Sequence, residues 1–465
     1  MEKEARGKGN GYRYLMATLG SSGLGLIYGL KVNLHVAIVS MVNHTAVSGG
    51  SSHNKSGSSS CDDVYPVSND EKAEDGPFVW STVVQGVLLS AYFLGYMVAE
   101  LPGGRIAEVF SAKWVMLGAV VVNIVGALLT PAAALWHYGA LILIRVLQGF
   151  GGGMTFPAMH VILAHWAPPT ERSVMSSIVY SGTALGTVIF MLVSGIIGSS
   201  LGWQYVFYIE GACSCIWMIF WIIFAADSPN ETSFISQDER SMIAASLGDE
   251  KHETKSVPWK AVWTSKAFWA ILIAHTCSNW GWYMVLIELP SYMKMVFNFK
   301  LSDNAVLTTI PFLCMWIFSM ILSKVLDTLL IKEKITTTWA RKTATLIASL
   351  GPLLCFVALC FIGCRREWAV ALMCVAVTCI GGMFCGFLSN HIDIAPNYAG
   401  TLMALTNTVA TIPGILVPLF VGWLTHDDPG INSWQIIFGV TMVLYVIEIL
   451  VYTTMGSGVE QSWNK

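Results

Sequence analysis

The sequence predicts an all-α polytopic membrane protein, with twelve transmembrane helices in two bundles of six. The first observation is composition: of 465 residues, 54% are hydrophobic and 12% are charged, and the mean hydropathy is +0.60. Soluble globular chains carry roughly 25% charged residues, so this chain has too few to cover a water-soluble domain. The second is a series of apolar runs that reach the roughly 20 residues needed to cross a bilayer. The third is a polar segment at 227–265 that divides these runs into two equal sets.

The expected spans are apolar runs bounded by charged or turn residues. They cover residues 14–42, 78–104, 113–135, 138–163, 172–199, 203–226, 266–297, 304–330, 340–363, 368–390, 395–424 and 433–455. As helices they satisfy their own backbone polar groups, which the bilayer core requires. Small residues four positions apart, as at Gly182 and Gly186 or at Gly149 and Gly153, allow neighbouring helices to approach closely.

The remaining segments complete the predicted organisation. It consists of a cytoplasmic tail at 1–13, a first six-helix bundle at 14–226 with an outer loop at 43–77, a cytoplasmic linker at 227–265, a second six-helix bundle at 266–455 and a cytoplasmic tail at 456–465. The outer loop is rich in Ser, Gly, Asp and Glu, a composition typical of disorder. In the linker, Ser236-Gln237-Asp238-Glu239 has the capping-box pattern and predicts a short helix that ends near Leu247.

Basic residues predict the orientation. With both ends inside, the cytoplasmic segments hold 17 Lys and Arg residues and the opposite side holds six, as the positive-inside rule expects. The pair Arg365-Arg366 on the outer side runs against this trend. The net charge of −3 gives no basis for a nucleic-acid partner, and we expect none.

The outer loop also carries sites of covalent chemistry. Two sequons, at Asn43 and Asn54, predict glycosylation there, whereas the sequon at Asn230 lies inside and is expected to stay unmodified. Cys61 lies in the same loop, and a disulfide to Cys364 is compatible with the topology. We expect a free thiol instead, because sequence does not supply the geometry that a disulfide needs.

A short pattern occurs after the second span of each predicted bundle. Gly104-Arg105-Ile106-Ala107-Glu108 and Ser323-Lys324-Val325-Leu326-Asp327 each place an acid near the cytoplasmic end of a helix, with basic residues beyond it. Positive-inside bias alone explains this pattern in one reading; in the other, the two halves are duplicated six-span units. With twelve spans and a central linker, the chain resembles the major facilitator superfamily, whose halves are parallel repeats with a midplane site between them.

Further motifs narrow the resemblance. They are Tyr28-Gly29-Leu30-Lys31-Val32-Asn33-Leu34, Thr155-Phe156-Pro157-Ala158-Met159-His160, Trp166-Ala167-Pro168-Pro169-Thr170-Glu171-Arg172-Ser173 and Asn390-His391-Ile392-Asp393-Ile394-Ala395-Pro396-Asn397-Tyr398-Ala399-Gly400. They resemble the anion:cation symporter family of that superfamily, which includes sialin, sodium–phosphate cotransporters and vesicular glutamate transporters. The resemblance runs from about Arg13 to Trp463, and sialin-like and insect phosphate-cotransporter members are the most similar types.

Two cations within spans are the main candidates for substrate binding. A charge at the centre of a span costs roughly 2.5–3.5 kcal/mol or more, so it is a functional-site hypothesis by default. Arg145 offers a planar fork of donors for a carboxylate or phosphate, and the resemblance implies an anion-site role; the alternative is snorkelling to the outer surface. Lys31 replaces the arginine usual in the family, so it can attract an anion without a bidentate clamp; a structural ion pair is its alternative. His35 shares the Lys31 helix face, and His160 matches a family histidine; an ordinary buried histidine is the other reading of His160.

The chain departs from the family where coupling to protons is expected. Sialin-like members carry acids three and seven residues after the span-four arginine, and these positions are Gln148 and Gly152 here. Neither binds and releases a proton, so sodium coupling is favoured. Ser278 occupies the position of a span-seven arginine of glutamate-type members, which weakens a glutamate interpretation.

Other polar residues are secondary candidates. Ser278, Asn279 and Tyr283 in span seven are candidates to line the substrate path, with packing as the alternative for the last two. Glu288 is a coupling candidate, although a structural acid is the preferred reading. Asn390, His391 and Asp393 form a polar cluster at the inner end of span ten, either as a gate or as a turn whose Asp caps the next helix.

Together these observations predict a secondary active transporter that moves a small anion, such as inorganic phosphate or an organic carboxylate, with a cation, sodium being favoured over a proton. The alternatives are a proton-coupled sialic-acid-type or uncoupled organic anion transporter and, from another class, a non-transporting receptor or scaffold, or a membrane-embedded enzyme. We find no convincing reactive Ser or His constellation and expect no enzyme, cofactor or metal. A functional monomer is expected. The plasma membrane is favoured over a lysosomal or vesicular membrane, because residues 1–13 contain no acidic dileucine sequence.

Overall fold

The computed structural model describes residues 11–43, 76–247, 256–297, 301–425 and 430–464. Within these ranges the chain is helical, and twelve helical segments are long and apolar enough to cross a membrane. This confirms the all-α fold class and the predicted number of spans. An isolated β-bridge between Val42 and Phe78 holds the end of the first helix beside the start of the second.

The first bundle contains six spans, the fourth of which is broken into two helices. Its elements are α1 (Tyr12–Met41), α3 (Thr82–Val109), α4 (Ala112–Trp136), α5 (Tyr138–Gly153), α6 (Thr155–Trp166), α7 (Arg172–Ser200) and α8 (Trp203–Phe224). The break between α5 and α6 follows the glycine run that ends at Gly153, where the Thr155 hydroxyl donates to the Gly152 carbonyl at 2.6 Å. Glycine lowers helix propensity, which makes this run the weak point of the span.

The second bundle repeats this arrangement. Its elements are α11 (Lys266–Phe297), α12 (Leu301–Ile331), α13 (Thr337–Leu359), α14 (Arg366–Ile380), η3 (Gly381–Phe384), α15 (Phe387–Ile394), η4 (Pro396–Tyr398), α16 (Ala399–Thr425) and α17 (Ile431–Met455). Its fourth span is also broken, at Gly381-Gly382 and Gly386. The fourth span of each bundle therefore places buried polar residues on a short helix that follows the break.

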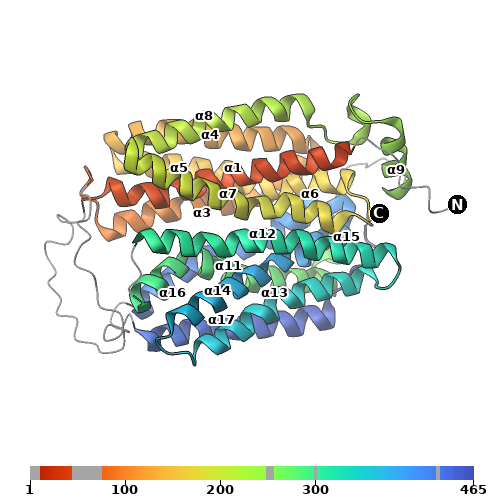
Figure 1. Ribbon diagram of the computed structural model, residues 1–465. Helices are drawn as coiled ribbons and strands as arrows, with labels where there is room; N and C mark the ends of the chain where they lie inside the picture. Colours follow the sequence, from red (N-terminus) through yellow and green to blue (C-terminus); the bar gives the residue numbers. More distant parts are fainter. Residues whose placement is uncertain (1–10, 44–75, 248–255, 298–300, 426–429, 465) are drawn as a thin grey trace.

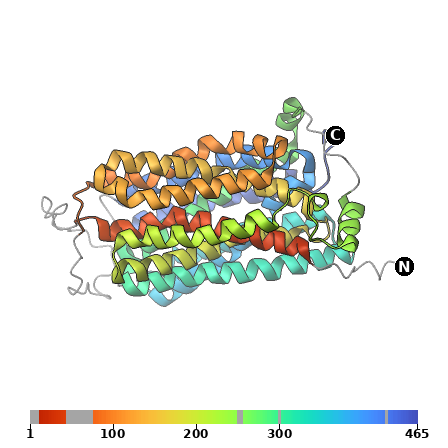
Figure 2. The same ribbon diagram turned by 90° about the horizontal axis from the view of Figure 1, so that it is seen from above.

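The linker lies at one end of the molecule. It contains η2 (Pro229–Glu231), α9 (Gln237–Leu247) and α10 (Trp259–Thr264). Figure 1 shows α9, the start of α1 and the end of α17 toward this end, and Figure 2 gives the view from above. We call it the linker end; the positive-inside distribution predicts that it is cytoplasmic.

The predicted linker helix is confirmed as α9, and its N-terminus also holds α1. The Ser236 hydroxyl accepts the Glu239 amide at 3.3 Å, which is one half of the expected capping box. The Glu239 carboxylate turns instead to α1, where it accepts the Tyr12 amide at 3.0 Å and the Arg13 guanidinium at 2.7 Å. Arg13 also donates to Glu171 at 2.7 Å. The linker is thereby fixed to the start of the first span.

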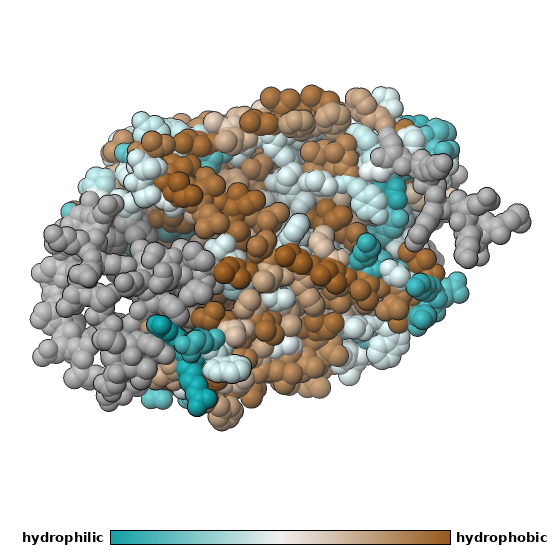
Figure 3. Space-filling view, in the orientation of Figure 1, coloured by the Kyte–Doolittle hydropathy of each residue, from teal (hydrophilic) through white to brown (hydrophobic). Residues whose placement is uncertain are grey.

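The surface has the polarity expected of a membrane protein. Figure 3 shows apolar side chains over the middle of the visible face, with hydrophilic ones gathered near the linker end and at the opposite edge. Many large apolar side chains are exposed on the span helices, among them Leu143, Ile196, Leu419 and Val443. Exposed apolar surface on this scale requires a lipid environment.

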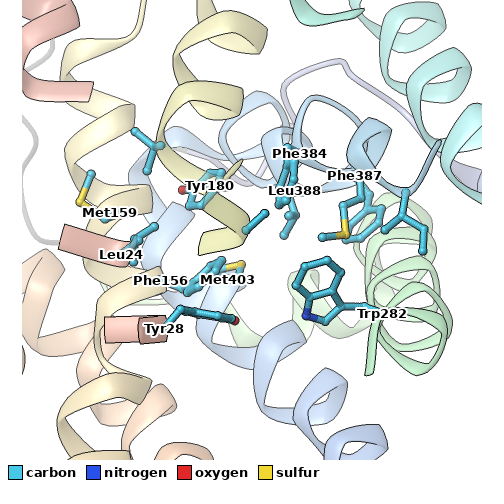
Figure 4. Close-up of a cluster of buried hydrophobic side chains, with 14 of the residues drawn as sticks. Leu24, Tyr28, Phe156, Met159, Tyr180, Trp282, Phe384, Phe387, Leu388 and Met403 are labelled. Carbon is cyan, nitrogen blue, oxygen red and sulfur yellow. The ribbon is translucent and has the colours of Figure 1, made fainter. Parts of the chain in front are cut away.

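The two bundles meet along α3 against α16 and α7 against α12. Between them lies a shared apolar core to which both contribute. Figure 4 shows Tyr28 and Phe156 of the first bundle close to Met403 and Trp282 of the second. The bundles thus share one interior surface, which positions the candidate site described below.

Two of the sequence expectations on covalent chemistry concern described residues. Cys364 is disulfide-bonded, so the expectation of free thiols was wrong at this residue; Cys61 lies outside the described residues. Nine other cysteines are free, and all nine lie in or beside spans. Asn43 lies just after α1, at the end opposite the linker, whereas Asn54 lies outside the described ranges.

A close glycine contact between α1 and α7 tests this packing. Gly25 of α1 and Gly186 of α7 meet backbone to backbone, so a side chain at Gly186 would collide with the Gly25 main chain. We expect Gly186→Ala to lower the stability of the detergent-purified protein by about 1–3 kcal/mol, because overpacking forces backbone shifts. Gly195→Ala on the same helix is the control, since a Cβ there meets open space. Equal melting temperatures of the two variants would contradict this packing.

Candidate substrate site

Lys31 lies near the middle of α1 and is buried between the bundles, with 2% of its surface exposed. Its ammonium nitrogen has no hydrogen-bond partner among the described residues. Five aromatic rings surround it, and we call this set the aromatic cage. Nζ lies 4.2 Å from the ring centre of Phe93, 4.9 Å from Tyr28, 5.5 Å from Tyr96 and Tyr283, and 5.6 Å from Tyr92. Cation–π attraction offsets part of the cost of burying this charge.

Helix periodicity assembles the cage. Tyr28 lies three residues before Lys31 on α1, so the two share a face. Tyr92 and Tyr96 are four residues apart on α3 and face α1 together with Phe93. Tyr283 comes from α11 and packs edge-on against Phe93 at 5.6 Å between ring centres. The cage is therefore completed by the second bundle.

Arg145 lies beside Lys31 and is fully buried, so it does not snorkel to the surface. Its guanidinium donates to the carbonyls of Leu30 at 3.3 Å and Lys31 at 2.6 Å. It also donates to the Gln148 amide oxygen at 3.0 Å, while Nε has no hydrogen-bond partner in the part of the chain that the structure describes. In this conformation Arg145 fixes the backbone that carries Lys31, and one of its N–H groups stays available.

Four buried polar atoms on or beside these two cations have no hydrogen-bond partner among the described residues. They are Lys31 Nζ, Arg145 Nε, Tyr92 OH and His35 Nδ1, each buried and without a partner among the described residues. The Arg145 guanidinium lies 5.3 Å from the Tyr92 ring centre. Leaving a buried polar group unpaired costs roughly 1–3 kcal/mol, and more if it is charged. Two cations with adjacent unpaired polar groups form a site with the chemistry to hold an anion.

The two positions that depart from the family are neutral for structural reasons. The Gln148 amide bonds Arg145 and donates to the Asn123 carbonyl at 3.1 Å. At Gly152 the Tyr92 hydroxyl occupies the space that a side chain would need. An acid at position 152 would displace a wall of the cage.

Glu100 on α3 is a residue that the sequence reasoning missed. It is fully buried, and its Oε1 accepts the Asn407 amide of α16 and the Thr411 hydroxyl at 3.5 Å. Its Oε2 has no partner among the described residues. The signal available in the sequence was an acidic residue inside the apolar run 78–104. Its position between the two bundles becomes apparent only in the tertiary structure.

His160 belongs to a buried histidine cluster between the bundles. Its ring nitrogens contact the Phe156 carbonyl of its own helix and the Leu388 carbonyl of α15, both at 3.0 Å. The His391 ring lies 5.3 Å from that of His160 and 6.1 Å from that of His275. Thr406 joins His275 and His391 through its hydroxyl. His160 and His391, predicted separately, are therefore neighbours, away from the aromatic cage.

Asp393 joins the bundles at the linker end. It accepts the Arg172 guanidinium at 2.8 Å and Arg341 Nε at 2.5 Å, and all three side chains are buried. Arg341 also donates to the Ser173 hydroxyl at 2.7 Å. The alternative that Asp393 caps the next helix is wrong, since η4 has no side-chain cap. We call Arg172, Arg341 and Asp393 the linker-end latch.

The two repeated loop motifs make equivalent contacts across the interface. Glu108 accepts the amide and hydroxyl of Thr401 at the start of α16, each at 2.6 Å. Asp327 accepts the Val174 amide at the start of α7, at 2.8 Å. Each acid therefore reaches the fifth span of the opposite bundle, which is the geometry expected of duplicated units.

The remaining predicted residues belong to the second bundle. Ser278 Oγ is buried and has no partner among the described residues, and Asn279 donates to the Ala410 carbonyl at 3.0 Å. Asn390 donates to the Tyr452 hydroxyl at 2.9 Å, within the second bundle. Glu288 is buried on α11, ten residues beyond Ser278. Of the predicted set, Lys31, Arg145 and Tyr283 meet at the aromatic cage, and His160 and His391 meet in the histidine cluster.

The latch generates a test. Asp393→Asn leaves two buried guanidinium groups facing a neutral amide, which destabilises the closed linker end. We expect faster labelling of Cys385 by a maleimide, measured by peptide mass spectrometry, because Arg341 bonds the Cys385 carbonyl at 2.9 Å. Asp238→Asn, which removes an exposed acid of α9, is the control and should leave Cys385 protected. Equal labelling in both variants would show that the latch does not hold this end closed.

Comparisons with known proteins agree with this architecture. Residues 14–418 match the Major Facilitator Superfamily. Sialin of Homo sapiens is 36% identical over 451 residues, covering 97% of this chain and 90% of sialin. A Drosophila melanogaster protein named "Putative inorganic phosphate cotransporter" is 35% identical, with 97% and 86% covered. Vesicular glutamate transporter 2 of Bos taurus is 33% identical, with 97% and 75% covered.

A solved structure shares the fold. The proton:xylose symporter XylE, bound to 6-bromo-6-deoxy-D-glucose, superposes with a TM-score of 0.71 at 14% identity over 97% of each chain. At this identity the likeness concerns the fold alone. The relatives and the fold are those of transporters and not of enzymes. The chain belongs to the Major Facilitator Superfamily and is a multi-pass membrane transporter related to sialin, phosphate cotransporters and vesicular glutamate transporters.

Proposed function

We propose that this transporter carries a small anion, inorganic phosphate or an organic carboxylate, together with a cation, by alternating access of a site at Lys31. The observation that carries the proposal is the unpaired, buried Lys31 ammonium between the bundles. An isolated buried charge is costly, and a bound anion would compensate it. The names of the phosphate cotransporter and vesicular glutamate transporter relatives each specify an anion, which supports the anion class.

Lys31 and Arg145 have different roles in anion binding in this proposal. Lys31 supplies the free charge that attracts the anion, and the aromatic cage excludes water around it. Arg145 holds the Lys31 backbone through two carbonyls and offers Nε to the substrate. The second bundle contributes Tyr283 to the cage, so a bound anion would contact both halves.

Alternating access requires the linker-end contacts to break. The latch, Glu108–Thr401 and Asp327–Val174 bonds all join the bundles at that end, which is therefore closed in this structure. Rocking of the bundles about the central site would break these bonds and open the other side. Each bond is charge-assisted, so the closed end has several bonds of roughly 1.5–3 kcal/mol to lose.

Sodium is the favoured coupling ion in this proposal. Gln148 and Gly152 are neutral where sialin-like members carry acids, and the Tyr92 hydroxyl leaves no room for an acid at position 152. A cation that accompanies the anion lowers the cost of moving a charged substrate through a low-dielectric interior.

Transport assays test the proposal directly. In proteoliposomes with an imposed sodium or proton gradient, we expect uptake of at least one labelled anion among phosphate, sialate, glutamate and urate. The gradient that drives uptake identifies the coupling ion. Absence of uptake of all four anions by correctly folded protein would refute the proposed function.

Substitution of Lys31 tests the anion site. Lys31→Gln should reduce uptake at least about tenfold, because a lost hydrogen bond to a charged group costs roughly 1.5–3 kcal/mol. Lys31→Arg keeps the charge and should retain more activity than Lys31→Gln. Lys266→Gln, at an exposed lysine at the start of α11, is the control and should transport normally. Wild-type uptake by Lys31→Gln would place the anion elsewhere.

A further inference from the structure

We propose that Glu100 is the binding site for the cotransported cation, and that Glu100 and Lys31 together enforce coupling by keeping the charge at the centre of the moving carrier constant. This inference rests on the proposed function, since it assigns a residue to the cation of the symport. It adds a site on α3 that sequence reasoning did not identify.

The Glu100 carboxylate has the features of an ion site, because one of its two oxygens is hydrogen-bonded and the other is open to a ligand. The side chain is 0% exposed, and its Oε1 accepts hydrogen bonds from Asn407 and Thr411. Oε2 is buried without a partner among the described residues. A buried carboxylate oxygen without a hydrogen-bond partner is costly, and a monovalent cation would satisfy it.

Glu100 also lies at a contact between the two bundles, so a cation bound to it would affect both. It belongs to α3 of the first bundle, whereas Asn407 and Thr411 belong to α16 of the second. Asn407 further donates to the Tyr96 hydroxyl of the aromatic cage at 3.2 Å. A cation at Glu100 would therefore act on the α3–α16 interface and on the cage wall at once.

The titratable groups that face Glu100 come from three helices. They are Lys31 and Tyr28 on α1, Tyr96 on α3 and Tyr283 on α11, each of which interacts electrostatically with Glu100. Among these, Lys31 is the cation. It forms none of the ion pairs found among the described residues, so the two opposite charges are near each other but not in contact. Both charges remain open to ligands.

Charge balance then gives a coupling rule. The empty carrier holds Lys31⁺, Arg145⁺ and Glu100⁻ at its centre. A monovalent anion alone at Lys31 lowers this central charge by one, a cation alone at Glu100 raises it by one, and the two together leave it unchanged. Because a change of charge in a low-dielectric interior is costly, only the empty and the doubly loaded carriers would change conformation readily.

The shared chemistry of the ligand is that of a monovalent cation bound by a carboxylate. A proton would convert Glu100 to a neutral acid, whereas Na⁺ would be held by its carboxylate and hydroxyl oxygens. The sodium and proton arms of the experiment distinguish the two sources.

The experiment compares wild type, Glu100→Gln, Glu100→Asp and Glu210→Gln in proteoliposomes, with whichever of labelled phosphate, sialate, glutamate or urate the wild type transports fastest. Glu210 is the matched control, a buried acid whose oxygens already accept Ser194 at 2.5 Å and Asn33 at 3.1 Å within the first bundle. Two quantities are measured: gradient-driven accumulation, and exchange of internal for external anion without a gradient.

We expect Glu100→Gln to become an exchanger. Its anion-loaded form has the same central charge as the empty wild type and moves, but its empty form carries one more positive charge and does not return. Accumulation should fall at least tenfold while exchange stays measurable, and Glu100→Asp and Glu210→Gln should both accumulate the anion. Wild-type accumulation by Glu100→Gln, or loss of exchange in folded Glu100→Gln protein, would overturn the inference.

The outcomes separate this inference from the function on which it rests. If the wild type transports none of the four anions, the proposed function fails and the inference falls with it. If the wild type accumulates an anion and Glu100→Gln does so equally, only the inference fails. Should Glu100→Gln not fold, the cation concentration for half-maximal uptake by Glu100→Asp decides: a shift of at least threefold supports the site, and an unchanged value refutes it.

Discussion

The cost of placing charge in a membrane interior is the constraint on which this structure depends. The buried charges between the bundles are compensated in different ways. The latch pairs Asp393 with two guanidinium groups, and Arg145 spends its donors on helix carbonyls. Lys31 has only aromatic rings around it, and Glu100 keeps one oxygen unpaired. The charges of the linker-end latch are paired with opposite charges, whereas Lys31 and Glu100 at the centre form none of the ion pairs found among the described residues. This difference separates contacts that hold one conformation from charges that the proposed ligands would compensate.

The same difference distinguishes the linker end of the molecule from its centre. Bonds that join the bundles are concentrated at the linker end, where each repeated loop acid reaches the opposite bundle. At the centre the bundles meet through apolar packing, the cage and the Glu100–Asn407 bond. Ligands at the centre and bonds at the end therefore compete through the same rigid helices, which is the physical basis of the alternating access that we propose.

Much of the fold was predictable because the bilayer imposes it. Spans must be apolar, long and helical, so twelve runs bounded by charges sufficed to place them, and the capping residue Ser236 placed α9. The candidate site was predictable only in part. Lys31 and Arg145 stand out as charges inside apolar runs, but Glu100 was overlooked, and the rings of the cage look like ordinary core residues in sequence. The pairing of Asp393 with Arg172 and Arg341 joins positions more than fifty residues apart, which no local pattern reveals.

The sequence by itself determined the membrane class, the number of spans and the two rare cations, because these follow from composition and from periodicity within single helices. Only the tertiary structure decided what those cations do. Arg145 proved to be a brace for α1 because two carbonyls lie within its reach, and Lys31 proved to be the open charge because rings, not acceptors, surround it. Whether a buried charge is satisfied depends on neighbours from other helices, and that information exists only once the helices are packed.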